Sequence, residues 1–175
     1  ATTGSSNTAI GDAALYANTS GANGVGLGRN ALFANTTGSK NTALGSYALA
    51  NNTTSDDSVA VGYYALHNNT AANNTAVGTQ SLIANTTGTN NVAVGAFALD
   101  ANTTGGYNIS VGQNSLGANT TGNYNIAIGQ DALANNTVSD NVAIGRAAMV
   151  ANTTGTQNTA VGGFALDANT TAANN

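Results

Sequence analysis

The chain is poor in charge. Charged residues make up only 6% of its 175 residues, against about 25% in an ordinary soluble protein. Seven acidic residues, all Asp, face three basic residues and one His, and the net charge is −4. This scarcity excludes a basic face for nucleic acid and a polybasic stretch for anionic lipid. Solubility therefore depends on Asn, Thr, Ser and Gly.

Cysteine and long apolar runs are also lacking. Without cysteine the fold uses neither disulfides nor thiolate metal sites. No apolar run approaches the ~18 residues of a transmembrane helix. No basic segment followed by an apolar one opens the chain, so a secretory signal is expected to be absent or removed. Residues 1–4 match part of a repeat, which predicts a processed chain or an excerpt of a longer array.

What the chain does contain is one short repeat in ten copies. Each copy has a glycine after a small-apolar tripeptide, and successive glycines lie 17 or 16 residues apart. A fixed short period indicates stacked units that bury their apolar faces against their neighbours. The chain is predicted to be a single repeat array over residues 1–175. Its coils start near residues 7, 24, 41, 58, 74, 91, 108, 125, 141 and 158.

Within each coil we number the starting residue as position 1. Position 2 is Thr, Val or Ile and position 4 is Val, Ile or Leu, as in the run Asn-Val-Ala-Val-Gly at 91–95. Alternating β-branched residues predict a short strand. A second short strand is predicted around position 9, which is Leu in nine coils and Met149 in the tenth. Asn, Thr and Gly at positions 12 to 15 mark the corner that returns the chain.

Two short strands per 17 residues predict an all-β fold, a parallel β-solenoid whose equivalent positions stack ~4.8 Å apart. Gly and the Asn-Thr-Thr segment recur too often for a helix. We expect Val94 and Leu99, with their equivalents in every coil, to point inward. Small residues at positions 3, 5 and 8 permit close backbone approach. Such a thin core should gain stability by packing against copies of itself.

The 16-residue steps reveal a larger period. They lie 67 residues apart, and the segment 94–102 recurs nearly unchanged as 161–169. This predicts duplication of a four-coil block. The one-residue deletions are expected in the corner after Asn-Thr, with the strands untouched.

The strands at 58–62, 91–95 and 141–145 resemble the N-S-V-A-I-G repeat of trimeric autotransporter adhesin heads. The whole repeat is also similar to repeats of phage tail-fibre and bacterial surface-fibre proteins. The resemblance covers almost the whole chain. It implies a left-handed parallel β-roll that is usually trimeric, whereas the general preference for parallel crossovers favours the right hand.

Catalytic chemistry is not expected. The Asp residues fall at different coil positions, and only Asp56 and Asp57 are neighbours. General acid–base catalysis would require a carboxylate or a nucleophile beside His67, and the repeat pattern places neither there. No helix follows the G-x-G at 24–28 to bind a nucleotide. We therefore predict no enzyme, no catalytic residue, no cofactor and no metal site.

Asparagine gives two hypotheses. Position 12 is Asn in all ten coils, which suits an internal ladder of stacked amides. N-x-S/T is also the acceptor motif for N-glycosylation, and every coil keeps one. In the two shortened coils the motif moves one residue upstream. The possible ladder members or glycan acceptors are Asn18, Asn35, Asn52, Asn68, Asn85, Asn102, Asn119, Asn135, Asn152 and Asn169.

Aromatic residues gather at position 7 and, as Tyr107 and Tyr124, at position 17. Such stripes can hold sugars, but packing against a neighbouring copy is the commoner explanation.

The predicted function is structural: an extracellular fibre or adhesin head that projects from a cell or virion. Its expected partners are copies of itself and a host-surface protein or glycan. Missing end caps and weak charge predict a homo-oligomer, either a lateral trimer or an end-to-end filament. The alternatives are an ice-binding solenoid, supported by the complete position-13 Thr column, and a β-helix that binds or processes carbohydrate.

Overall fold

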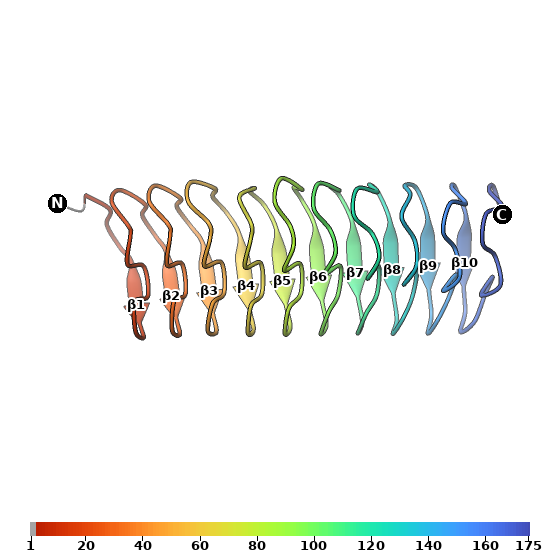
Figure 1. The fold of residues 1–175 in the computed structure, drawn as a ribbon, viewed down its shortest axis with the longest axis horizontal. Coiled ribbons are helices and arrows are strands. Elements are labelled where there is room, and N and C mark those ends of the chain that lie inside the picture. Colours follow the sequence, from red (N-terminus) through yellow and green to blue (C-terminus); the bar gives the residue numbers. More distant parts are fainter. Residues whose placement is uncertain (1–2) are drawn as a thin grey trace.

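The computed structural model describes residues 3–175, which form a rod of stacked coils (Figure 1). Each coil contributes one three-residue strand, and no helix occurs among these residues. The strands are β1 (Thr8–Ile10), β2 (Val25–Leu27), β3 (Thr42–Leu44), β4 (Val59–Val61), β5 (Thr75–Val77), β6 (Val92–Val94), β7 (Ile109–Val111), β8 (Ile126–Ile128), β9 (Val142–Ile144) and β10 (Thr159–Val161).

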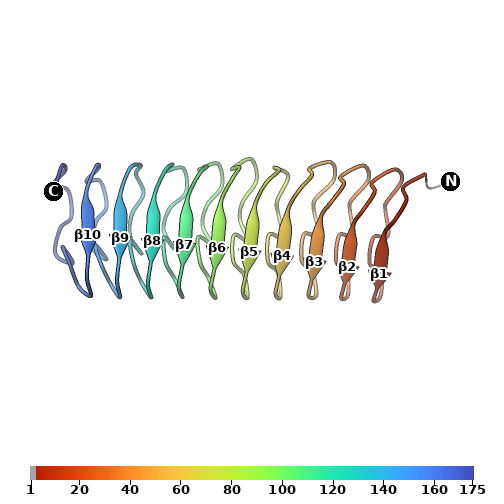
Figure 2. The same ribbon diagram turned by 180° about the vertical axis from the view of Figure 1, so that it is seen from behind.

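The ten strands form one parallel sheet in sequential order, side by side along the rod in both views (Figure 1, Figure 2). Every pairing is in register at positions 2, 3 and 4. Val92 lies beside Ile109, for example, and Val94 beside Val111. The pairing also holds across the shortened coils, between β4 and β5 and between β8 and β9. The deletions therefore lie outside the strands, as predicted.

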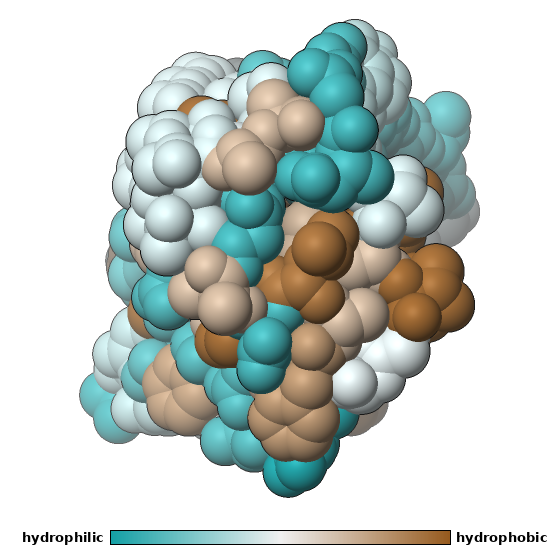
Figure 3. Space-filling model, turned by 90° about the vertical axis from the view of Figure 1, so that its right-hand side faces the viewer, coloured by the Kyte–Doolittle hydropathy of each residue, from teal (hydrophilic) through white to brown (hydrophobic). Residues whose placement is uncertain are grey.

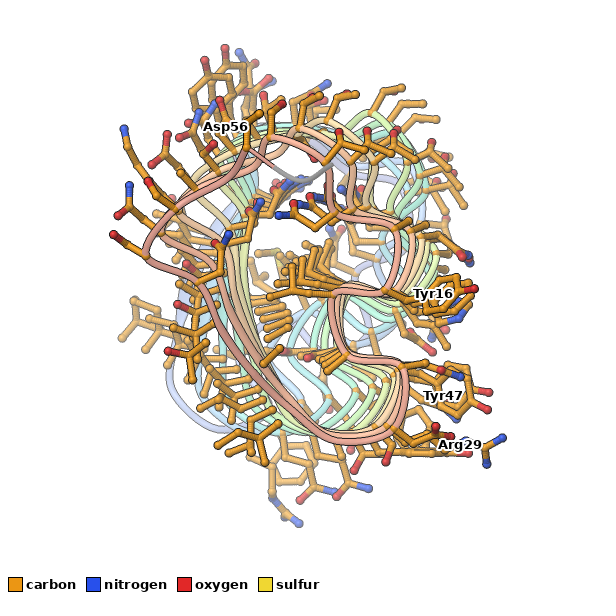
Figure 4. All side chains as sticks on the ribbon, turned by 90° about the vertical axis from the view of Figure 1, so that its left-hand side faces the viewer. Tyr16, Arg29, Tyr47 and Asp56 are labelled. Carbon is orange, nitrogen blue, oxygen red and sulfur yellow. The ribbon has the colours of Figure 1, made fainter. Side chains whose placement is uncertain are left out.

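The solenoid is left-handed. Figure 4 looks along the rod from the N-terminal end, so the chain recedes from the viewer. Arg29, Tyr47, Tyr16 and Asp56 stand at coil positions 6, 7, 10 and 16, and they follow one another counter-clockwise in this view. The strand occupies the remaining side, between positions 16 and 6. The hand agrees with the resemblance and opposes the general rule for parallel crossovers.

The second predicted strand does not form. Positions 7 and 9 have positive φ in all ten coils, for example 57° at Phe97 and 54° at Leu99. These left-handed residues turn the backbone sharply and break the extended geometry that a strand needs. The segment still stacks on its neighbours, since the Leu82 N–H donates to the Ala98 carbonyl of the next coil at 3.0 Å.

The core is narrower than the sequence suggests. The leucine at position 9 points inward and is fully buried at Leu99, as predicted, but Val94 is 36% exposed. The residue that faces inward from the strand is the small one at position 3, such as Ala93. The prediction that Val94 points inward is therefore wrong.

The position of Gly26 explains why the strand turns its small residue inward. A Cβ built on Gly26 would lie 3.5 Å from Cγ of Leu15 and 3.3 Å from the Ala31 carbonyl oxygen. The space accepts a methyl group and little more, because the leucine of the preceding coil already fills the interior. The larger Val, Ile and Leu residues of the strand must lie outside.

Candidate functional site

Buried asparagine amides form a column along the inside of the corner. Asn102 Nδ2 donates to Asn85 Oδ1 of the preceding coil at 2.8 Å and to the Gly105 carbonyl of its own corner at 2.9 Å. Asn119 Nδ2 bonds in the same way to Asn102 Oδ1, at 3.2 Å. Each amide closes its own corner and ties it to the coil before it. A buried polar group at this position is therefore hydrogen-bonded rather than reactive.

The shortened coils interrupt this ladder. Asn69 and Asn136 donate to the carbonyl oxygens of Ala71 and Val138 at 2.6 and 2.7 Å, and no bond reaches the preceding coil. Asn119 Oδ1 is consequently left without a partner among the described residues. Three ladder segments result: Asn18, Asn35 and Asn52; Asn69, Asn85, Asn102 and Asn119; Asn136, Asn152 and Asn169.

Asn68 and Asn135 do not belong to the ladder, so the prediction that these two residues are ladder members is wrong. Both side chains are exposed, while the adjacent Asn69 and Asn136 are fully buried. The reason is the threonine that follows. Thr70 Oγ1 donates to the Thr86 carbonyl of the next coil at 2.9 Å, as the position-13 threonine does elsewhere, so Asn69 occupies position 12.

The same geometry sorts the possible glycan acceptors. Asn68 and Asn135 are exposed, and Asn18 and Asn169 are half-buried. The other six amides lie inside the corner. They are Asn35, Asn52, Asn85, Asn102, Asn119 and Asn152.

A second asparagine column, at position 1, was not identified as a ladder from the sequence. Asn91 Oδ1 accepts a bond from the Asn108 backbone N–H of the next coil at 3.0 Å, and Asn91 Nδ2 donates to the Gly105 carbonyl at 2.8 Å. The amide thus joins the start of the strand to the corner. The sequence does contain a signal for this second column, because Asn occupies position 1 in eight of the ten coils.

The outer face of the sheet carries apolar side chains. Positions 2 and 4 of each strand point away from the core and are partly or fully exposed, with Ile109, Ile128 and Ile144 each 38% exposed. Position 4 is Val, Ile or Leu in every coil, position 2 is Val or Ile in six coils and Thr in four, and neither position is ever charged. The end view in Figure 3 shows hydrophobic side chains on this flank. We call this surface, positions 2 and 4 of β1 to β10, the sheet face.

Threonine at position 13 forms a regular exposed column at the corner. Thr86 Oγ1 donates to the Thr103 carbonyl and Thr103 Oγ1 to the Thr120 carbonyl, both at 3.0 Å. Seven such bonds occur among the described residues. They hold the threonine side chains in one orientation along the rod.

Titratable groups are scattered. Arg29 and Asp12 approach to 3.9 Å, and Lys40 and Asp57 to 3.8 Å, with all four side chains well exposed. Within residues 3–175 there is no cluster of three or more His, Cys, Asp or Glu that could hold a metal ion, and no pocket. Burial raises the pKa of the Asp100 carboxyl, partly offset by backbone hydrogen bonds from Asp100 and Ala101.

The aromatic residues stack from coil to coil. Tyr47 and Tyr64 lie with ring centroids 4.8 Å apart, and Tyr107 and Tyr124 with centroids 5.1 Å apart. His67 is not isolated, because its ring lies 4.7 Å from Tyr64 and its Nδ1 lies 2.9 Å from Asn68 Oδ1.

No protein-family model, curated protein or solved structure matches the chain. None of the described residues belongs to a helix that is long and apolar enough to cross a membrane.

Proposed function

We propose that this chain is a structural rod, part of an extracellular fibre or adhesin head, which assembles with copies of itself through the sheet face. The observation that carries the proposal is the exposed apolar column at position 4, which is Val, Ile or Leu in all ten coils, with Val or Ile beside it at position 2 in six coils. Contiguous exposed apolar surface of this extent is typical of interaction sites rather than of isolated soluble rods.

The periodicity of the sheet face supports a second copy as the partner. The apolar column at position 4 runs through all ten coils at the strand spacing. Two identical rods can therefore pack side by side along their whole length. Charge repulsion is almost absent, because the chain carries only −4 over 175 residues. The resemblance to adhesin heads favours three copies around one axis and a place at the cell or virion surface.

Light scattering at micromolar concentration tests this proposal. We expect an oligomer of the 17.0 kDa chain. A Val94→Lys, Val111→Lys double variant places two charges on the sheet face and should yield monomers. The matched control is Thr87→Lys, Thr104→Lys, which adds the same charge at exposed corner positions. A monomeric parent protein, or a face variant as oligomeric as the control, would refute the proposal.

Ice binding is the second candidate, and the position-13 threonine column favours it. Regularly spaced hydroxyl and methyl groups of fixed orientation are suited to ordering water. Thermal hysteresis of the purified chain measures this activity directly. An absence of hysteresis and of ice shaping would eliminate the candidate without affecting the assembly proposal.

A further inference from the structure

We propose that one flank of coils 1 to 4 binds a neutral oligosaccharide chain. This aromatic flank consists of Tyr16, Phe33, Tyr47, Tyr63, Tyr64 and His67. The inference deepens the proposed function, on which it rests, by naming the class of partner that an adhesin or fibre of this kind would contact.

Aromatic residues are concentrated on this part of the rod. Five of the nine Phe and Tyr residues lie between residues 16 and 64. Tyr16 stacks on Phe33 with centroids 5.4 Å apart and 7° between the ring planes, and Tyr47 stacks on Tyr64 at 4.8 Å and 13°. Because the rings already support one another, a ligand would immobilise few side chains on binding.

Two rings keep surface available for a ligand. Phe33 covers one face of Tyr16, which is still 74% exposed. Tyr63 is 50% exposed and stands at 80° to Tyr64, outside the stacked column. The C–H face of a pyranose ring can rest on such an apolar plane while the phenol hydroxyl bonds to sugar hydroxyl groups.

Uncharged polar groups adjoin the rings. Asn51 Nδ2 donates to Asn68 Oδ1 at 3.0 Å, beside His67. The one cation nearby, Arg29, lies over the Tyr47 ring at 5.6 Å and 3.9 Å from a carboxylate oxygen of Asp12. Its charge is therefore already balanced. Flat rings with amide and hydroxyl groups around them fit a neutral, hydroxyl-rich ligand better than an anionic one.

The aromatic flank is separate from the sheet face. Tyr16 and Tyr47 project from the side of the coil opposite the strand (Figure 4). Positions 6 and 7 of coils 7 and 8 carry Gln113, Asn114, Gln130 and Asp131 instead of aromatic rings. Position 7 also carries Phe97 in coil 6 and Phe164 in coil 10, but only coils 1 to 4 carry a ring in every successive coil. A contact between copies along the rod would need a pattern repeated along its length, so this local concentration favours a local ligand.

Isothermal titration with four soluble neutral hexaoses, the gluco-, manno-, malto- and chito-oligomers, tests the inference. We expect binding of at least one by the parent protein and a loss of about tenfold or more in affinity for Tyr16→Ala, Tyr63→Ala. The matched control is Tyr107→Ala, Tyr124→Ala, which removes an aromatic pair elsewhere on the rod and should bind within about twofold of the parent. Circular dichroism would verify that both variants are folded.

Three results would overturn the inference: no hexaose bound by the parent, unchanged affinity in the flank variant, or an equal loss in the control. Light scattering of the same samples distinguishes failure of the oligosaccharide inference from failure of the assembly proposal. Neither tyrosine pair lies on the sheet face, so both variants should remain as oligomeric as the parent protein. A protein that binds a hexaose but is monomeric would contradict only the assembly proposal.

Discussion

Truncation of Leu99 to Ala tests the architecture of the core most directly. Leu99 is fully buried between the equivalent leucines of the adjacent coils, Leu82 and Leu116. Removing three carbon atoms forfeits about 2.4 kcal/mol of transfer free energy at ~0.8 kcal/mol per carbon. A cavity term is added, because the ladders and the sheet limit collapse around the gap. We expect a loss of about 3 kcal/mol, within the 2–5 kcal/mol typical of such substitutions.

Urea unfolding followed by circular dichroism measures this loss, at a protein concentration low enough to keep the chain monomeric. The matched control is Val94→Ala, in the same coil but on the sheet face. Its cost in the monomer should stay below about 1 kcal/mol, because no buried cavity forms. If Val94→Ala cost as much as Leu99→Ala, the assignment of the inner and outer sides of the strand would be wrong.

Three further predictions concern other positions. Gly112→Ala should lower the free energy of unfolding more than Gly162→Ala. Both glycines have positive φ, 133° and 128°, so either substitution introduces about 1–3 kcal/mol of strain. A Cβ on Gly112 would in addition lie 2.5 Å from the carbonyl group of Gly129. Asn102→Ala, which removes three buried hydrogen bonds, should cost about 2 kcal/mol or more in urea unfolding, whereas Asn135→Ala, at an exposed position, should be nearly neutral. Asp100→Asn should stabilise the fold at neutral pH, because burial raises the pKa of the Asp100 carboxyl above 3.8 and the charged form opposes folding. In pH-dependent melting this gain should vanish below pH 3.8, and at neutral pH it should exceed the effect of Asp167→Asn at an exposed position. An equal cost for each pair, or a gain from Asp100→Asn that persists in acid, would contradict the corresponding assignment.

The period and the strand positions could be predicted from the sequence because they depend on repetition. A β-branched residue at position 2 and a Val, Ile or Leu at position 4 recur in every coil, and each pair lies in a strand of the in-register sheet. The second strand could not be excluded, since its left-handed residues include Phe97 and Leu99 rather than glycine. Leucine at positive φ is costly, and its inward side chain compensates for the strain only in the folded context.

The prediction of which face of the strand is buried was wrong, and the reason bears on function. The usual rule buries the larger apolar residue of an alternating pair, which would place Val94 inside and Ala93 outside. The coil is too narrow for that arrangement, so the alternation is inverted. An isolated rod would tolerate polar residues at position 4, because nothing inside the coil contacts them. Yet position 4 is Val, Ile or Leu in all ten coils. A column that is uniformly apolar without serving the core supports a role in contact with another molecule, and its regular spacing supports a second rod of the same kind.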